Sequence, residues 1–213
     1  MCVDRAGVVG ADGETHQGTL DLAFFRLVPN LNIIAPKDFK ELEDMLEFCV
    51  KLKKPVVIRY PRGGEDTYKF KKHEKIILGK SEVLKEGKDI TIIAIGKTVA
   101  RAMKVAQKLE KKQINAEVIN ARFLKPLDVG TIKESIQKTK NVITIEDGTI
   151  IGGLATAIKE LIIDEKIENV KINTFAYPDE FIRHATVDEL EKIYGVDVDT
   201  IVLNVVRQKD KEF

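Results

Sequence analysis

From Asn30 onward, short runs of β-branched residues alternate with segments in which apolar residues recur every three or four positions. Alternation at this spacing is typical of an α/β fold, in which helices cover both faces of a mostly parallel sheet. We therefore predict a chain of this class. Its 213 residues are enough for one large or two small domains of roughly 100–200 residues each.

The first 64 residues contain one predicted β-α-β unit. Residues 31–35 form an apolar run that stops at a proline, and Asp38 with Glu41 three positions later has the spacing of a helix N-cap. Residues 56–58 form the next strand, which leads into a loop that carries Arg62. The helix between the strands has one predicted apolar face, made of Leu42, Met45, Leu46, Cys49 and Val50.

Residues 65–75 are polar and lack an apolar face, so we interpret them as a linker between units 1–64 and 76–213. The second unit begins with residues 76–84 and 90–95, which flank a glycine turn and predict an antiparallel hairpin. Further elements follow at α/β spacing. We predict helices at 99–111, 128–137, 153–163 and about 197–208, and strands at 116–120, 142–145 and 170–175.

Charge and cysteine content exclude several classes of protein. Thirty-five Lys and Arg against 34 Asp and Glu give a net charge of +1, which disfavours a nucleic-acid binder. Cys2 and Cys49 are distant and form no CxxC pair, so we expect free thiols rather than a zinc site or a disulfide framework. Because no apolar run reaches the ~18–20 residues of a membrane span and no signal peptide is recognisable, we expect a soluble, cytoplasmic protein without a membrane partner.

Four loop residues before position 65 carry the chemistry needed to handle a small anionic substrate. Arg5 and Arg62 each lie near glycine, and guanidinium groups bind phosphate with a planar fork of donors. Asp12 and His16 share one glycine-bounded loop, where a carboxylate and an imidazole can bind hydroxyls and move protons. Simpler interpretations stay open: a surface ion pair for Arg5, a strand-end cap for Arg62, a turn for Asp12 and an uninvolved loop imidazole for His16.

For the remaining candidate residues we favour structural roles. Gly96 and the pair Gly152-Gly153 precede helices and could offer backbone amides to an anion, although glycine there more often makes a tight turn. Glu146 and Asp147 are acidic enough for a metal, but no third ligand is visible, so we predict no metal site. We also expect solvated or packed side chains for His73 and His184.

Three motifs carry a family resemblance: Asp4-Arg5-Ala6-Gly7, Asp12-Gly13-Glu14-Thr15-His16-Gln17-Gly18 and Arg59-Tyr60-Pro61-Arg62-Gly63. In this order they resemble the 1-deoxy-D-xylulose-5-phosphate synthases, a branch of the transketolase family of thiamine diphosphate enzymes. The second motif alone is similar to transketolases in general, and the other two distinguish the branch. Residues 121–128 and 151–153 resemble the C-terminal domain of the same family.

The resemblance implies a fold and a set of roles. Residues 1–64 would be the C-terminal part of a pyrimidine-binding domain, and residues 76–213 a transketolase C-terminal-like domain. The arginines matching Arg5 and Arg62 hold the substrate phosphate in the family, while Asp12 and His16 match the acid and the imidazole that face the substrate carbons. By resemblance, we expect His16 to be catalytic and Arg5, Asp12 and Arg62 to bind substrate.

The resemblance also implies an activity that condenses pyruvate with glyceraldehyde 3-phosphate with loss of CO2, for isoprenoid, thiamine and pyridoxal synthesis. Thiamine diphosphate and Mg²⁺ would serve the complete enzyme, but their family sites precede the first motif, so we expect the chain to be a C-terminal section that is inactive alone. Its partner would be a second copy or the missing N-terminal section. The alternatives are a subunit of a split transketolase or of a 2-oxo acid dehydrogenase decarboxylase, and a non-catalytic dimerisation domain.

Overall fold

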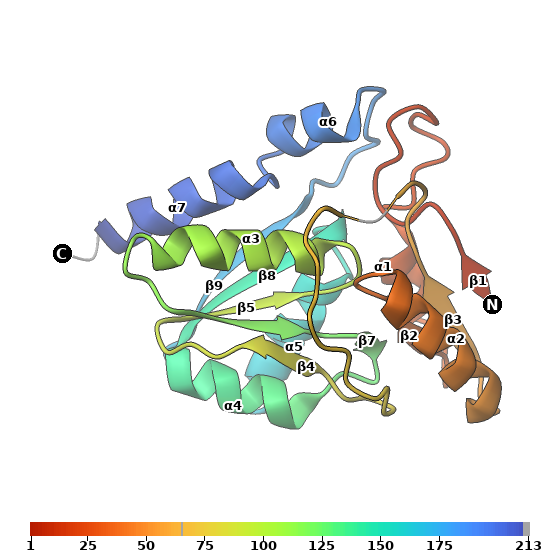
Figure 1. The fold of residues 1–213 in the computed structure, drawn as a ribbon, viewed down its shortest axis with the longest axis horizontal. Coiled ribbons are helices and arrows are strands. Elements are labelled where there is room, and N and C mark those ends of the chain that lie inside the picture. Colours follow the sequence, from red (N-terminus) through yellow and green to blue (C-terminus); the bar gives the residue numbers. More distant parts are fainter. Residues whose placement is uncertain (65, 211–213) are drawn as a thin grey trace.

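A computed structural model describes residues 1–64 and 66–210, which form two sheets and their covering helices (Figure 1). The smaller sheet has the strand order β1-β3-β2-β7, in which β1, β3 and β2 are parallel and β7 pairs antiparallel with β2. Its strands are β1 (Cys2–Val3), β2 (Asn32–Ile34), β3 (Val56–Arg59) and β7 (Phe123–Lys125). The predicted β-α-β unit is confirmed by the parallel pairing of β2 with β3, and β1 and β7 extend the sheet to four strands, β7 coming from far along the chain.

The larger sheet has the strand order β4-β6-β5-β8-β9, and all its pairings are parallel except that of β4 with β6. Its strands are β4 (Glu82–Lys85), β5 (Ile90–Ala94), β6 (Ala116–Asn120), β8 (Asn141–Thr149) and β9 (Lys171–Tyr177). The predicted mostly parallel α/β architecture is therefore confirmed. The chain leaves β5 to form β6 on one side and then returns to form β8 on the other, so the strand order reverses between β5 and β8.

The predicted hairpin of residues 76–84 with 90–95 is wrong, because β6 lies between β4 and β5. Asn120 pairs with Glu82 on one side of β6, and Ala116 pairs with Ile90 on the other. All five residues of β6 are buried, so this strand needs a neighbour at each edge. The turn at Gly87 packs against the backbone of Ala116, where a Cβ would come within 2.2 Å of the carbonyl carbon.

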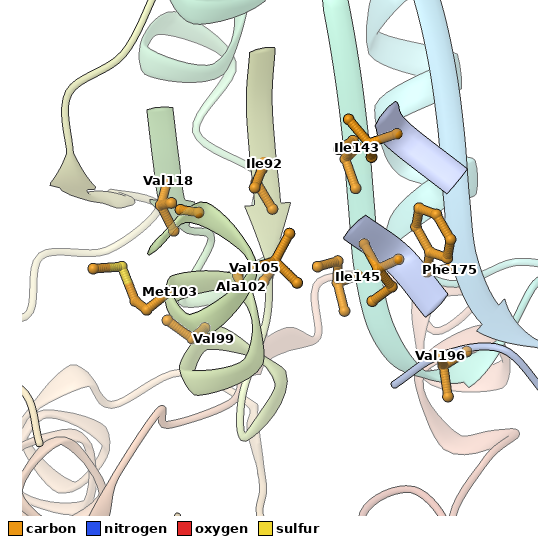
Figure 2. Packing of buried hydrophobic residues seen from close by; sticks show 14 of the residues in the cluster. Ile92, Val99, Ala102, Met103, Val105, Val118, Ile143, Ile145, Phe175 and Val196 are labelled. Atoms are coloured by element: carbon orange, nitrogen blue, oxygen red, sulfur yellow. The ribbon is translucent and has the colours of Figure 1, made fainter. Parts of the chain in front are cut away.

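Helices cover both faces of the larger sheet (Figure 1). On one face lie α3 (Thr98–Glu110), α6 (Val187–Ile193) and α7 (Val198–Asp210). Figure 2 shows Val105 of α3 lying between Ile92 and Ile145 of the sheet, and Val99 and Ala102 belong to the same buried cluster. On the other face, α4 (Val129–Thr139) and α5 (Leu154–Asp164) build a second core cluster. Because helices bury both faces of this sheet, its strands have continuous apolar sequences.

The helix α2 (Phe39–Leu52) begins as predicted, because the Asp38 side chain accepts a hydrogen bond from the backbone N–H of Glu41. The predicted apolar face is only partly correct. Met45 is fully buried, whereas Leu46 is 41% and Val50 is 82% exposed. The strands beneath α2 are two to four residues long, so they cover one narrow stripe of the helix. A further short helix, α1 (Asp21–Arg26), was not predicted.

Buried ionic groups join the segments on either side of residues 65–75. Glu41 accepts hydrogen bonds from Lys37 and from Arg122, and Lys37 also donates to Glu82. All four side chains are at most 2% exposed. Together with β7 in the smaller sheet, these contacts give the two predicted units a common interior. No helix within the described ranges is long and apolar enough to cross a membrane.

Candidate functional site

The carboxylate of Asp12 binds both arginines that the sequence singled out. The Nε of Arg5 donates to Oδ2 at 2.8 Å, and Nη1 of Arg62 donates to Oδ1. Arg5 also donates to Asp4 at 2.7 Å. The structure therefore brings together three of the four predicted site residues in one cluster, which we call the arginine cluster (Arg5, Asp12 and Arg62).

Strand pairing explains this convergence. Val3 of β1 lies beside Arg59 of the parallel strand β3, so both strands end at the same edge of the smaller sheet. Backbone hydrogen bonds continue the pairing past the strand ends, from Ala6 N–H to the carbonyl of Tyr60. Ligand sites in parallel sheets form at this carboxyl edge. Arg5 has a left-handed φ of 60°, an uncommon conformation that occurs where surrounding contacts enforce it.

Hydrogen bonds from Arg5 and then Arg62 lower the pKa of Asp12, and the bond to Asp12 raises the pKa of Arg5. The Asp12 carboxylate and the Arg5 guanidinium are therefore both ionised at neutral pH. Because Asp12 satisfies one edge of each guanidinium, the arginines are held in place with further donors to offer. Such an arrangement can take up a phosphate dianion without first ordering two long side chains.

His16 lies on the same loop but outside the arginine cluster. Its ring Nδ1 lies 2.9 Å from Oγ1 of Thr15, and its backbone N–H donates to the carbonyl of Gly13 at 3.2 Å. The imidazole is exposed. The catalytic role predicted for His16 remains a hypothesis.

The second unit holds the loop that carries Asp12 and His16. The amide of Gln17 donates to the carbonyls of Ile182 at 2.7 Å and Arg183 at 3.3 Å, and its oxygen accepts from the N–H of Val9. Gly13 packs so closely on His184 that a Cβ there would come within 2.1 Å of the ring carbon Cε1. His184 is exposed in the structure, with its ring lying against the backbone of Gly13. No signal in the sequence pairs these distant residues.

Arg59, in the third motif, is a buried anchor for the same loop. It donates to the carbonyl of Gly18 at 2.9 Å, to Asp21 at 2.8 Å and to Asp147 at 2.5 Å. Burial alone would lower the pKa of Arg59, but Asp147 and Asp21 raise it above its ordinary value. Its guanidinium therefore ties the end of the site loop, the start of α1 and the end of β8 together.

Glu146 has a structural role, as predicted for the acidic pair. Its two oxygens accept hydrogen bonds from the N–H groups of Leu154 and Ala155, each at 2.8 Å, at the start of α5. Burial raises its pKa to about 7. The amides after Gly152 and Gly153 are therefore occupied by a carboxylate of the same chain. Over residues 1–64 and 66–210, no three His, Cys, Asp or Glu side chains are grouped as a metal ion would require.

Both parts of the chain match models of known protein families. Residues 1–64 match the family model of the transketolase pyrimidine binding domain, and residues 79–201 match that of the transketolase C-terminal domain.

Two curated relatives illustrate the similarity and have the same name. The chain is 43% identical over 212 residues to the 1-deoxy-D-xylulose-5-phosphate synthase of Caldanaerobacter subterraneus subsp. tengcongensis, covering 100% of this chain and 34% of that protein. It is 45% identical over 195 residues to the enzyme of the same name from Dictyoglomus turgidum, covering 91% of this chain and 31% of that protein. The chain thus spans about a third of the length of these relatives.

Solved structures agree on the fold. A chain described as a split gene transketolase in an inactive β4 tetramer superimposes with a TM-score of 0.83 at 29% identity, covering 97% of this chain and 64% of that one. A transketolase variant from Pichia stipitis gives a TM-score of 0.71 at 18% identity, covering 96% and 29%, which supports the fold alone.

Proposed function

This chain belongs to the transketolase family, and we propose that it forms the C-terminal section of a 1-deoxy-D-xylulose-5-phosphate synthase. Residues 1–64 would be the tail of the pyrimidine-binding domain, residues 65–75 a linker and residues 76–213 the C-terminal domain. The complete enzyme would condense pyruvate with glyceraldehyde 3-phosphate and release CO2. The observation that supports this proposal best is the arginine cluster, which presents two guanidinium groups beside one carboxylate.

In this proposal the arginines bind the phosphate of the acceptor aldehyde. Two guanidinium groups can neutralise a phosphate dianion and fix its orientation through paired donors. Asp12 would keep both arginines in place and accept a hydrogen bond from a substrate hydroxyl. Addition to the aldehyde carbon converts its carbonyl oxygen into an alkoxide, and the imidazolium of His16 would donate the proton that this oxygen needs.

Thiamine diphosphate and Mg²⁺ are part of the proposal for the complete enzyme. The thiazolium of the cofactor, when bound, supplies the electron sink for decarboxylation of pyruvate. The described residues lack a metal-ligating group of three side chains, so they do not fit the metal. We assign neither group to a residue of this chain.

The complete site would need a partner, either a second copy or a chain carrying the N-terminal section. The structural relative described as a split gene transketolase favours a second candidate, a subunit of a split transketolase. The two candidates differ in their products. Pyruvate and glyceraldehyde 3-phosphate would give a deoxyketose phosphate and CO2 in the first, whereas the second would exchange ketol units between sugar phosphates.

Reconstitution tests the proposal. The chain is mixed with an N-terminal section of a curated relative, thiamine diphosphate and Mg²⁺, and deoxyxylulose phosphate and CO2 are measured together. We expect product from the mixture and none from this chain alone. Arg5→Gln and Arg62→Gln should each raise the KM for glyceraldehyde 3-phosphate by about 10–100-fold, because each substitution removes one charge-assisted contact with the phosphate. The matched control is Arg207→Gln, on the exposed face of α7.

Two outcomes would contradict the proposal. Ketol transfer between sugar phosphates without CO2 release would assign the chain to a split transketolase. Light scattering that shows a dimer unaffected by thiamine diphosphate would favour a non-catalytic dimerisation domain instead. The reconstitution mixture would then also be inactive in an assay in which an intact control enzyme is active.

A further inference from the structure

The structure leaves both cysteine thiols free, as expected, and places them on the same face of the smaller sheet. Cys2 of β1 pairs in parallel register with Ile58 of β3, and Ile58 pairs with Ile34 of β2. Side chains of residues that pair in this way point to the same face of a sheet. Ile34 and Ile58 belong to the core cluster beneath α2, against which Cys49 packs. Cys2 therefore lies on the face of the sheet that α2 covers.

The helix α2 directs Cys49 toward the edge of the sheet at which β1 lies. Met45 is fully buried in the core cluster beneath the helix. Phe48 lies against Phe123 of β7, at the opposite edge of the sheet, with ring centroids 6.0 Å apart. Successive residues of a helix are rotated by about 100°, so positions 48 and 49 lie on opposite sides of position 45. Because Phe48 leans toward β7, Cys49 leans toward β1.

The two cysteines also lie at the same end of the smaller sheet. α2 follows the carboxyl end of β2 and leads back to the amino end of β3, so Cys49, in its last turn, lies beside the amino end of β3 (Figure 1). β1 meets β3 at this end. The ammonium group of Met1 donates to the carbonyl of Val56 at 2.8 Å, and the Met1 carbonyl accepts from the N–H of Ile58 at 3.0 Å. Cys2 and Cys49 are thus neighbours although they are far apart in the chain.

The ionisation of Cys49 agrees with this placement. Burial raises the pKa of the Cys49 thiol, the N-terminal ammonium group lowers it, and Cys2 raises it further. One charged group shifts the pKa of another only when the two are close together. Cys2 is exposed and Cys49 is partly buried, so a small reagent in solution meets the Cys2 thiol first.

We propose that Cys2 and Cys49 form a reversible disulfide that ties β1 to α2. The oxidant is a small disulfide such as oxidised glutathione. The Cys2 thiolate attacks one sulfur of this disulfide, whose S–S bond breaks and releases the first small thiol. The Cys49 thiolate then attacks the Cys2 sulfur of the mixed disulfide and releases the second. The two protons lost by the cysteines end on the released thiols, and the small disulfide is reduced by the two electrons that the cysteine sulfurs give up.

The bond would fasten the strand that leads into Arg5. β1 is two residues long and, among the strands that the structure describes, lies at the edge of its sheet, so it can adjust to the geometry that a disulfide requires. Closing the chain between positions 2 and 49 restricts the unfolded state more than the folded state, so the oxidised chain should be the more stable form. The inference is independent of the proposed function, because it involves neither substrate nor thiamine diphosphate.

Oxidation in glutathione buffers tests the proposal. The chain is equilibrated at increasing ratios of oxidised to reduced glutathione, quenched with acid and weighed by mass spectrometry. We expect both thiols to be lost with two hydrogen atoms, and a non-reducing tryptic digest to link the peptide of Cys2 to that of Cys49. Dithiothreitol should reverse the change. Because the fold holds the thiols together, the bond should form at a ratio about tenfold lower in the folded chain than in urea.

Cys2→Ser and Cys49→Ser are the matched controls. Neither variant should form an internal bond, and oxidation should raise the urea midpoint of the unchanged chain but of neither variant. Thiols that do not react, glutathione adducts on both cysteines or disulfide-linked dimers in place of the internal bond would overturn the proposal. An internal bond that forms as readily in the unfolded chain as in the folded chain would also overturn it.

Discussion

Arg59 and Asp147 form a fully buried ion pair between the end of β3 and the end of β8, with Nη1 of the arginine 2.5 Å from Oδ1 of the aspartate. Each side chain is 1% exposed. Because Arg59 also donates to the carbonyl of Gly18, the pair connects the larger sheet to the loop that carries Asp12 and His16. The loop's position thus depends on a residue from the second unit.

Asp147→Asn should therefore destabilise the fold strongly. Removing one member of a buried pair leaves the other charge without full compensation, which costs roughly 3–5 kcal/mol. Urea unfolding followed by circular dichroism measures the change. Asp199→Asn is the control, because Asp199 pairs with Lys108 at an exposed position and should change stability by less than about 1 kcal/mol. Equal midpoints for the two variants would contradict this role of the pair.

Glu146 should make stability depend on pH in an unusual direction. Burial raises its pKa to about 7 in the folded protein, against about 4.3 in an unfolded chain. Between these values the folded state keeps a proton that the unfolded chain has released. The free energy of unfolding should then fall as pH rises through this window, by up to about 1.4 kcal/mol per unit, and level off above it.

Glu146→Gln tests this dependence, since the substitution removes the titrating group. The difference in unfolding free energy between the variant and the unchanged chain should change steadily with pH between about pH 4.3 and 7 and stay constant at higher pH. Parallel curves over the whole range would show that Glu146 does not titrate in that window.

Gly153→Ala should disrupt the start of α5. A Cβ at this position would lie 2.1 Å from Oε2 of Glu146, the side chain that caps the helix. Displacing a buried, hydrogen-bonded carboxylate should cost about 3 kcal/mol, near the upper end of single substitutions. Gly64→Ala serves as the control, because among the described residues no atom beyond the chain neighbours of Gly64 lies within 4 Å of the added carbon. Thermal unfolding at one pH compares the two variants.

Gln17→Ala should loosen the site loop, because it removes the bonds to Ile182 and Arg183 and leaves the Val9 N–H without its acceptor. Loss of partly buried hydrogen bonds costs about 1–3 kcal/mol. Faster amide exchange should appear in residues 9–18, with little change in β5 or β6. Gln107→Ala, exposed on α3, is the control. Unchanged exchange in the loop would mean that Gln17 does not anchor it.

His16→Ala tests the imidazole in the reconstituted enzyme. If His16 supplies the proton for the new hydroxyl, kcat should fall by roughly 10²–10⁴, with a smaller effect on the KM for glyceraldehyde 3-phosphate. The control is His73→Gln, whose ring contacts Asp38 at the start of α2. A His16→Ala enzyme with normal kcat would exclude this role.

Local patterns in the sequence predicted much of the fold. The cap at Asp38 and the strand β6 (Ala116–Asn120) agree with the structure because caps and apolar periodicity depend on residues near one another in the chain. The choice of Arg5, Asp12 and Arg62 as site residues followed from loop motifs and from a family resemblance, whereas the ion pairs that join both arginines to Asp12 are seen only in the structure.

Strand pairing and long-range contacts needed the tertiary structure. A hairpin of β4 with β5 satisfies the same local pattern as the observed insertion of β6, and only the burial of β6 on both faces decides between them. Likewise, the contact of Gln17 with Ile182 and the placement of Cys2 and Cys49 on one face of the smaller sheet join segments far apart in the chain. The sequence alone thus determined element types and candidate chemistry, because these are local. Which elements become neighbours was decided by packing over the whole chain.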